Sequence, residues 1–127
     1  MAHAPAPINL ASKFASVADH WNPRIIAELN GQLVKIVKFK GEFVWHRHEE
    51  EDELFLVAAG RMQMGLRDFG GERWVEVGPA EMIVIPRGVE HCPRAAEEAQ
   101  VVLFEPASTL NTGNVQSNRT RRTLERI

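Results

Sequence analysis

The chain has 127 residues, a formal net charge of −2 and a single cysteine, Cys92. This length suits one domain that can bury a core. Acidic and basic residues are mixed, so the sequence carries no electrostatic footprint for nucleic acid or for an anionic membrane. One cysteine excludes an intramolecular disulfide and fits a reducing compartment, and no apolar run reaches membrane-spanning length. We therefore expect a cytoplasmic protein whose partner is a small molecule or another subunit.

Residues 1–32 are expected to form an N-terminal segment with one short helix and the first strand. Apolar residues recur at helical spacing within residues 8–20, which predicts a helix that covers one end of a barrel. A strand is expected at 24–29. The pair Asn30-Gly31 between two apolar runs is a strong hairpin signal, so the chain should turn back here into a second strand.

Residues 33–106 are expected to form a β-barrel of short strands. Apolar segments with turn residues between them recur at 33–40, 42–48, 53–59, 61–67, 73–77 and 82–85, around His91, and at 100–105. Many short strands with almost no helix are typical of an all-β barrel or sandwich. The remaining tail, 107–127, is polar and holds four arginines between Arg119 and Arg126. We expect this tail to be solvated or to form a surface strap.

Three histidines and a glutamate have the spacing of a metal site. His46 and His48 lie two apart in a predicted strand, so both imidazoles point to one face. Glu53 begins the next strand after an acidic turn, and a strand after the turn at 86–88 would bring His91 to the same pocket. This donor set suits one divalent transition metal, Zn, Mn, Fe, Ni or Co, and the absence of thiolates argues against a structural four-cysteine zinc site. Two positions of an octahedral metal would stay open for water, oxygen or a substrate.

Two motifs in the sequence resemble those of the cupin superfamily. The first motif is matched by Gly41, His46, His48, Glu53 and Gly60, and the second by Pro86, Gly88 and His91. The resemblance covers about residues 33–106 and implies a double-stranded β-helix, or jelly-roll barrel, in which the three histidines and the glutamate are metal ligands. The sequence departs from the family pattern at Ala80, where the second motif opens with glycine, and at Ala95, where asparagine is frequent.

The ending of the chain is similar to that of small single-domain cupins, the cupin 2 type, that are loosely labelled mannose-6-phosphate-isomerase-like. That label does not establish a substrate, because no set of residues here specifically demands a sugar phosphate. Side-chain parity predicts the wall of the metal pocket. The residues expected on the metal side are Val44, Phe55, Val57, Met62, Met64, Met82 and Phe104, each of which is equally well explained as barrel core.

Other side chains are expected to lie away from the metal. Trp45 has the opposite parity to the histidines, as do Phe43 and Arg47, so all three should pack outside. Cys92 adjoins a ligand but faces the other side of its strand, and we expect an inert thiol there. The strand 53–59 is apolar on both faces, which therefore both need a cover, and this predicts a homodimer.

Two classes of function fit the predicted site. In the first, the chain is a metal-dependent enzyme, of the isomerase or dioxygenase type, acting on a small oxygen-bearing metabolite. An isomerase would need a separate general base, and the spacing identifies none, so catalytic residues stay unknown. In the second class, the barrel is a binding or sensing module with a structural or chelating metal. A titratable group on the cavity wall would favour an enzyme, and an entirely apolar wall would favour binding.

Overall fold

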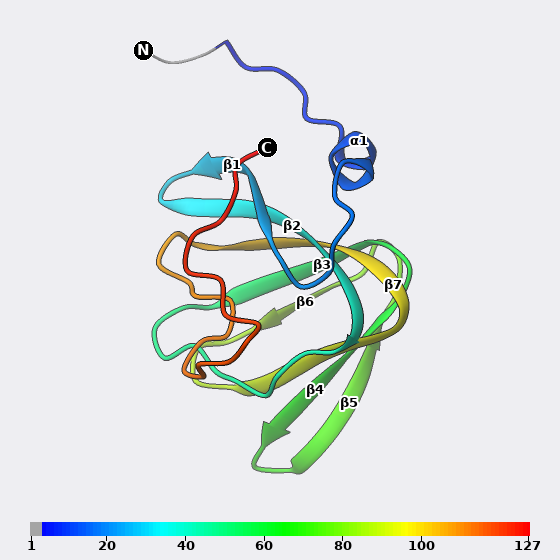
Figure 1. Cartoon of the computed structure of the whole chain (residues 1–127). Helices are drawn as coiled ribbons and strands as arrows, with labels where there is room; N and C mark the ends of the chain where they lie inside the picture. The colour runs from blue at the N-terminus through cyan, green and yellow to red at the C-terminus, as the bar shows by residue number, and fades with distance from the viewer. Residues whose placement is uncertain (1–3) are drawn as a thin grey trace.

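The computed structural model describes residues 4–127 and shows a barrel of antiparallel strands with one short helix (Figure 1). In chain order the elements are α1 (Leu10–Ala15), β1 (Arg24–Leu29), β2 (Gln32–Glu42), β3 (Glu53–Ala59), β4 (Met62–Asp68), β5 (Gly71–Val77), β6 (Met82–Ile85) and β7 (Glu90–Pro106). The predicted all-β class with a short N-terminal helix is therefore confirmed. Within the part of the chain that the structure describes, no helix has the length and apolarity needed to cross a bilayer.

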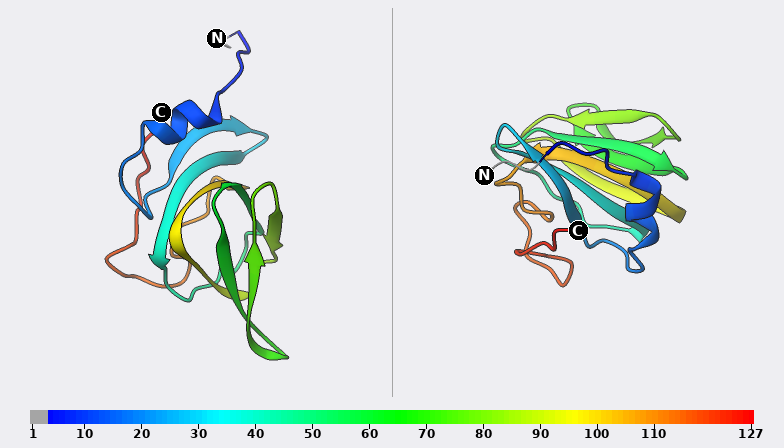
Figure 2. Two further views of the ribbon diagram at one scale, coloured as in Figure 1. Left: turned by 90° about the vertical axis from the view of Figure 1, so that its right-hand side faces the viewer. Right: turned by 90° about the horizontal axis from the view of Figure 1, so that it is seen from above.

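Strand β7 organises the sheet. It pairs with β2 along most of its length, with β3 on its other side, and with β4 near its start. Strands β1, β6 and β5 extend the sheet beside β2, β3 and β4 respectively. The strands curve around a common interior (Figure 2), and the β4–β5 hairpin projects from the end opposite α1 (Figure 1).

The structure replaces two predicted strands, around His91 and at 100–105, with the single strand β7. The segment between them, 96–98, is exposed, and its sequence suggests a break between two strands. Its backbone nevertheless stays extended. The pairing of β7 with β2 shifts its register opposite this segment, between Phe39 and Gly41 of β2. The two strands therefore pair both before and after the segment. Strand β7 therefore carries His91 at one end and the barrel core at the other.

Apolar side chains fill two clusters, one inside the barrel and one beneath α1. The inner cluster includes Val57, Met64 and Val101, all fully buried. The second cluster places Phe14 and Val17 against the outer face of β2 and β7. The helix is shorter than the predicted 8–20, because the Ser16 backbone N–H and hydroxyl both donate back to carbonyls of the last turn and end it.

The tail packs along the barrel instead of extending into solvent. The backbone N–H of Ile25 in β1 donates to Glu125, and the Ile127 N–H donates to Ile25. Thr112 is fully buried, and its hydroxyl lies 2.7 Å from that of Thr120. Residues 107–127 therefore form an ordered strap, which Figure 1 shows running along one side of the barrel from the end of β7 to β1.

Candidate metal centre

The four predicted ligands lie together inside the barrel. His46, His48, Glu53 and His91 are all buried, and one nitrogen or oxygen of each lies within 4.8 Å of the others. Glu53 opens β3 and His91 is the second residue of β7. His46 and His48 come from the segment that follows β2. The sequence therefore predicted which residues converge. Two of them lie on strands, and the other two lie on the segment that follows β2.

The predicted strand at 42–48 is wrong, because β2 ends at Glu42 and the next residues are irregular. Their backbone groups bond to three different segments instead of one ladder. His46 exchanges two hydrogen bonds with His91, of 3.0 and 2.8 Å. Arg47 bonds to Asn114 of the tail, and the carbonyl of His48 accepts from Gly88. The two histidines are thus held by long-range contacts and not by strand parity.

Backbone carbonyls orient two of the imidazoles. The Nδ1 atom of His46 lies 2.8 Å from the carbonyl oxygen of Val44, and Nδ1 of His91 lies 2.9 Å from that of Val89. A carbonyl only accepts, so each Nδ1 carries the proton and each Nε2 keeps a lone pair for a ligand. Burial, reinforced by the neighbouring His91, lowers the pKa of His46 to about 3. His46 is therefore neutral near pH 7, the form that binds metal.

Glu53 completes the cluster. Its Oε1 lies 3.2 Å from Nε2 of His48 and 3.3 Å from Nε2 of His91. Burial raises the pKa of Glu53, but the adjacent imidazoles of His48 and His91 outweigh burial and hold it well below its usual range. Neighbouring ligands at about 2.1 Å from an octahedral metal are about 3.0 Å apart, close to these separations.

One buried atom of the cluster has no hydrogen bond. His48 Nε2 is excluded from solvent, and although Glu53 Oε1 lies 3.2 Å away, the two atoms are not aligned for a hydrogen bond. A buried polar atom without a hydrogen bond normally lowers the stability of the fold, because water bonds to the same atom in the unfolded chain. A cation between the four donors would satisfy this nitrogen and the Glu53 carboxylate together. The donor set, its spacing and the unsatisfied nitrogen all fit a divalent metal.

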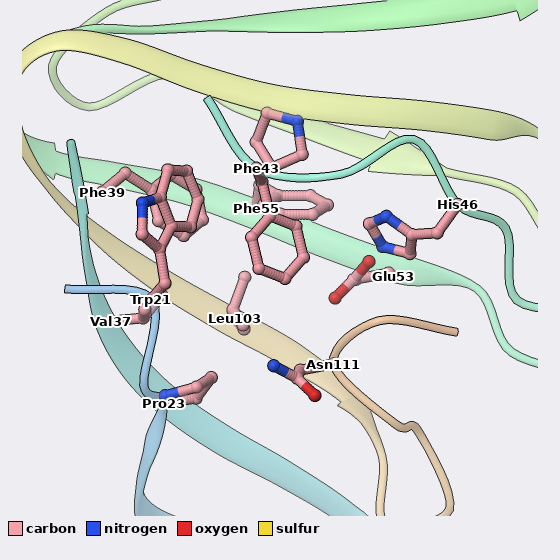
Figure 3. Close-up of a pocket in the computed structure, with 11 residues that line it drawn as sticks. Trp21, Pro23, Val37, Phe39, Phe43, His46, Glu53, Phe55, Leu103 and Asn111 are labelled. Carbon is pink, nitrogen blue, oxygen red and sulfur yellow. The ribbon is translucent and has the colours of Figure 1, made fainter. Parts of the chain in front are cut away.

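A narrow aromatic cavity of about 30 Å³ lies against the cluster. Its lining is formed by Trp21, Pro23, Val37, Phe39, Phe43, His46, Glu53, Phe55, Pro93, Leu103 and Asn111 (Figure 3). The ring of Trp21 stacks on Phe39 at 4.4 Å and on Phe43 at 4.9 Å. This volume holds about two water molecules. The cavity therefore admits a small or planar group unless its walls move.

The prediction of which residues form the cavity wall is right in part. Phe55 lines the cavity as expected, whereas Phe43 was expected outside and instead sets its ring edge-on to His46 at 5.5 Å. Parity failed for Phe43 because the strand ends before it. Met82 is 62% exposed and therefore does not line the cavity.

The other predicted wall residues lie elsewhere in the fold. Val57, Met62 and Met64 are buried in the barrel core. Phe104 lies beside Leu54 on the outer face of the sheet, and Val44 contributes its carbonyl to His46.

Trp21 and Asn111 were not identified from the sequence as site residues. Both lie outside residues 33–106, and long-range packing brings them to the cavity. The Trp21 indole N–H donates to the Lys40 carbonyl at 2.8 Å. The Asn111 amide donates to the Arg119 carbonyl and accepts from the Arg121 N–H. A lone tryptophan among polar residues was the one available signal for Trp21.

The tail also clamps the segment that bears the histidines. Asn114 accepts from the Arg47 N–H at 2.8 Å through its side chain and donates its own N–H to the Arg47 carbonyl at 3.1 Å. Gly113 has a φ of 54°, and a Cβ there would lie 2.2 Å from the Arg47 carbonyl oxygen. Only glycine permits this approach, so the residue between His46 and His48 is fixed by the tail.

Two predictions about side chains near the cluster are confirmed. Cys92 is buried outside the cavity, and burial, with the nearby Glu42 carboxylate, raises the pKa of its thiol to about 12. A thiol in this state is a poor nucleophile and a poor ligand. Trp45 packs outside, edge-on to Trp74 at 5.5 Å, with the Arg67 guanidinium 3.8 Å above its ring.

A small antiparallel barrel that buries three histidines and one glutamate together belongs to the class of β-barrels with a candidate metal site in the interior. The particular family follows from the sequence comparison, in which the cupin domain matches residues 33–105. The chain belongs to the cupin family. It is also 34% identical over 70 residues to the Bacillus subtilis protein YdbB, and that alignment spans 55% of this chain and 59% of YdbB.

Solved structures share the fold. A cupin-2 domain protein from Shewanella frigidimarina is 45% identical, with a TM-score of 0.73, covering 78% of this chain and 93% of its own. A Neisseria meningitidis protein is 29% identical, with a TM-score of 0.71, covering 80% and 100%. Hydroquinone 1,2-dioxygenase from Sphingomonas sp. TTNP3 is 18% identical, with a TM-score of 0.72, over 81% of this chain and 33% of that one. At this identity the last match concerns the fold alone.

Proposed function

We propose that this cupin binds one divalent transition metal through His46, His48, Glu53 and His91 and receives a small oxygen-bearing metabolite in the adjoining aromatic cavity. The observation that carries the proposal is the buried His48 Nε2, which has no hydrogen-bond partner although three other donors surround the same space. A bound metal would act as a Lewis acid or a redox centre for a ligand oxygen.

Of the two enzyme types, the cavity favours a dioxygenase over an isomerase. Isomerisation needs a side chain that moves a proton. Apart from the proposed ligands, the one polar residue of the lining in the described chain is Asn111, and backbone groups occupy both ends of its amide. Oxidation at a redox metal does not need such a group.

The second candidate is a binding or sensing module. The apolar wall that disfavours an isomerase also suits a ligand held without turnover, with the metal chelating its oxygen. Oxygen uptake separates the two candidates. Protein loaded with Fe²⁺ should consume oxygen with one of a panel of small phenols and enediols if it is a dioxygenase. Tight binding of a panel member without oxygen uptake would support the sensing module.

Metal binding itself is tested by elemental analysis of protein purified without chelators or an affinity tag. We expect about one equivalent of metal and a rise in melting temperature when Mn, Fe, Co, Ni or Zn is added to stripped protein, because a ligand of the folded state stabilises it. His48→Ala should lower occupancy. His20→Ala, at a half-buried histidine that pairs with Glu98 outside the cluster, is the matched control and should not. Stripped protein that neither binds nor is stabilised by any of these metals would refute the proposal.

We also propose a homodimer formed through the outer face of β3 and β6. Met82 is 62% and Val84 51% exposed there, next to the half-buried Leu54 and Phe104. An exposed apolar patch of this kind is typical of a subunit interface. Light scattering should give twice the 14.3 kDa of one chain. Val84→Lys should give a monomer, and a monomeric wild-type protein at micromolar concentration would contradict the dimer.

A further inference from the structure

Arg119, in the strap at the end of the chain, differs from every other arginine in the contacts of its guanidinium. Within the described part of the chain this half-buried guanidinium forms no ion pair and no hydrogen bond. Each of the other arginines forms an ion pair or donates a hydrogen bond, as Arg126 does to Glu28 and Arg122 to Gln116. A guanidinium has five N–H donors and is always charged. The donors of Arg119 are therefore available to a ligand.

The guanidinium lies over the aromatic wall of the cavity. Its Cζ is 5.3 Å from the ring centroid of Trp21 and 6.0 Å from that of Phe43, and both rings line the cavity. The centroid of the Phe43 ring is in turn 5.5 Å from that of the His46 ring. Figure 3 shows His46 and Glu53 at one end of the cavity and Trp21 toward the other. One aromatic ring, that of Phe43, therefore neighbours both the guanidinium and the candidate metal centre.

The backbone of Arg119 is held beside the cavity by both of its polar groups. Its N–H donates to Ser117 Oγ at 3.1 Å, and its carbonyl accepts from the side-chain amide of Asn111 at 2.8 Å. Asn111 itself lines the cavity. The attraction between a cation and an aromatic face helps to keep the guanidinium over Trp21, but a ring offers no oxygen to its N–H groups. The strap thus places a positive charge with free donors at the cavity.

We propose that Arg119 is a specificity-determining residue, which binds a carboxylate of the ligand while the metal binds another oxygen of the same molecule. This inference rests on the proposed function, because it takes the metal centre and the cavity as the ligand site. A guanidinium matches a carboxylate with two parallel hydrogen bonds, and such charge-assisted bonds are roughly twice as strong as neutral ones. The described residues of the lining include no lysine or arginine.

The charge of this site favours a carboxylate over a phosphate. A carboxylate carries one negative charge, which a single guanidinium balances, whereas a phosphate group carries up to two and offers three acceptor oxygens. The substrate class is therefore a small carboxylate with a second oxygen that binds the metal. Its body would lie against the rings of Trp21 and Phe43, which line the cavity near both charged ends.

The test measures how Co²⁺-loaded protein binds two matched pairs of chelators, followed by the visible spectrum of the metal. Catechol is compared with protocatechuate, and propionohydroxamate with succinate monohydroxamate; within each pair the second compound adds one carboxylate. The first pair is planar, and the second is narrow and flexible. Arg119→Met removes the charge and keeps an unbranched side chain over the rings. Arg122→Met is the matched control, because it removes an exposed arginine of the same strap that donates to Gln116.

We expect the preference of the wild type for the carboxylate compound to fall about 10-fold in Arg119→Met in at least one pair. The affinities for catechol and propionohydroxamate should not change, and Arg122→Met should match the wild type with all four compounds. A purely structural role of Arg119 would weaken both members of a pair alike, so the ratio of their affinities separates the two roles. Metal affinity, measured by chelator competition, should be equal in the three proteins.

A preference that Arg119→Met leaves unchanged in both pairs would overturn the inference, as would an equal loss of affinity for both members of each pair. The same holds if Arg122→Met lowers the preference as much, because the effect would then follow from the net charge of the strap. Wild-type protein that binds no metal, or binds metal but none of the four compounds, refutes the proposed function instead. The two failures are therefore distinguishable.

Discussion

Replacing His46 should flatten the acid dependence of stability in metal-free protein. The folded state holds the pKa of His46 at about 3, against an ordinary value of 6.5. Below about pH 6.5 the unfolded chain therefore binds a proton at this residue that the folded chain excludes. The contribution of His46 is complete above this pH and is lost as the pH falls toward 3. His46→Gln removes the imidazole and should remove this contribution.

The size of the effect follows from the shift. One pKa unit corresponds to about 1.4 kcal/mol, so His46 makes the free energy of unfolding fall by up to about 2 kcal/mol between about pH 6.5 and pH 5. Glu105 acts with the opposite sign, because its raised pKa makes the folded state lose stability as the pH rises above the ordinary carboxyl value. Glu53 has a lowered pKa and acts only below that value. The difference between wild type and variant isolates His46 from both.

Urea unfolding in a chelator at several pH values measures this difference. The stability of the wild type relative to His46→Gln should shrink steadily between about pH 6.5 and pH 5. Val101→Ala removes no titratable group and is the control: it should lower stability at every pH, and its curve should run parallel to that of the wild type. Parallel curves for wild type and His46→Gln would refute the reasoning, since they would mean that His46 is protonated as easily in the fold as in the unfolded chain.

Three substitutions elsewhere test how the fold supports the site. Phe14→Ala, which empties the contact beneath α1, should cost about 3 to 5 kcal/mol by urea unfolding and leave metal affinity unchanged. Ala80→Gly should stabilise the protein by about 1 kcal/mol in the same assay, because Ala80 holds a φ of 64° where the cupin motif has glycine. Gly113→Ala should weaken metal binding in chelator competition, since its Cβ would push the Arg47 carbonyl away. An unchanged affinity would show that the tail does not fix the histidine segment.

The sequence predicted the buried cluster of His46, His48, Glu53 and His91 better than it predicted the cavity beside it. A continuous apolar run after the acidic turn placed Glu53 at the start of a strand, and motif spacing identified all four members of the cluster. Parity failed for Phe43, because the segment after β2 bonds to several distant parts of the chain and no pattern of neighbouring residues encodes such bonds. Trp21 and Asn111 reach the cavity through packing of the two chain ends, which local sequence does not determine.

The interior of this barrel divides into an apolar part and a polar part. Val57, Met64 and Val101 fill the first with side chains that need no partner, and their burial supplies stability. The second gathers the metal cluster together with Lys35 and Glu105, where every buried charge lowers stability unless it is matched. A fold keeps so many ionisable groups out of water where they serve a function, because apolar residues at the same positions would pack without that cost. Lys35 and Glu105 therefore differ from the rest of the core, and their 3.1 Å contact offsets part of the cost of burying them.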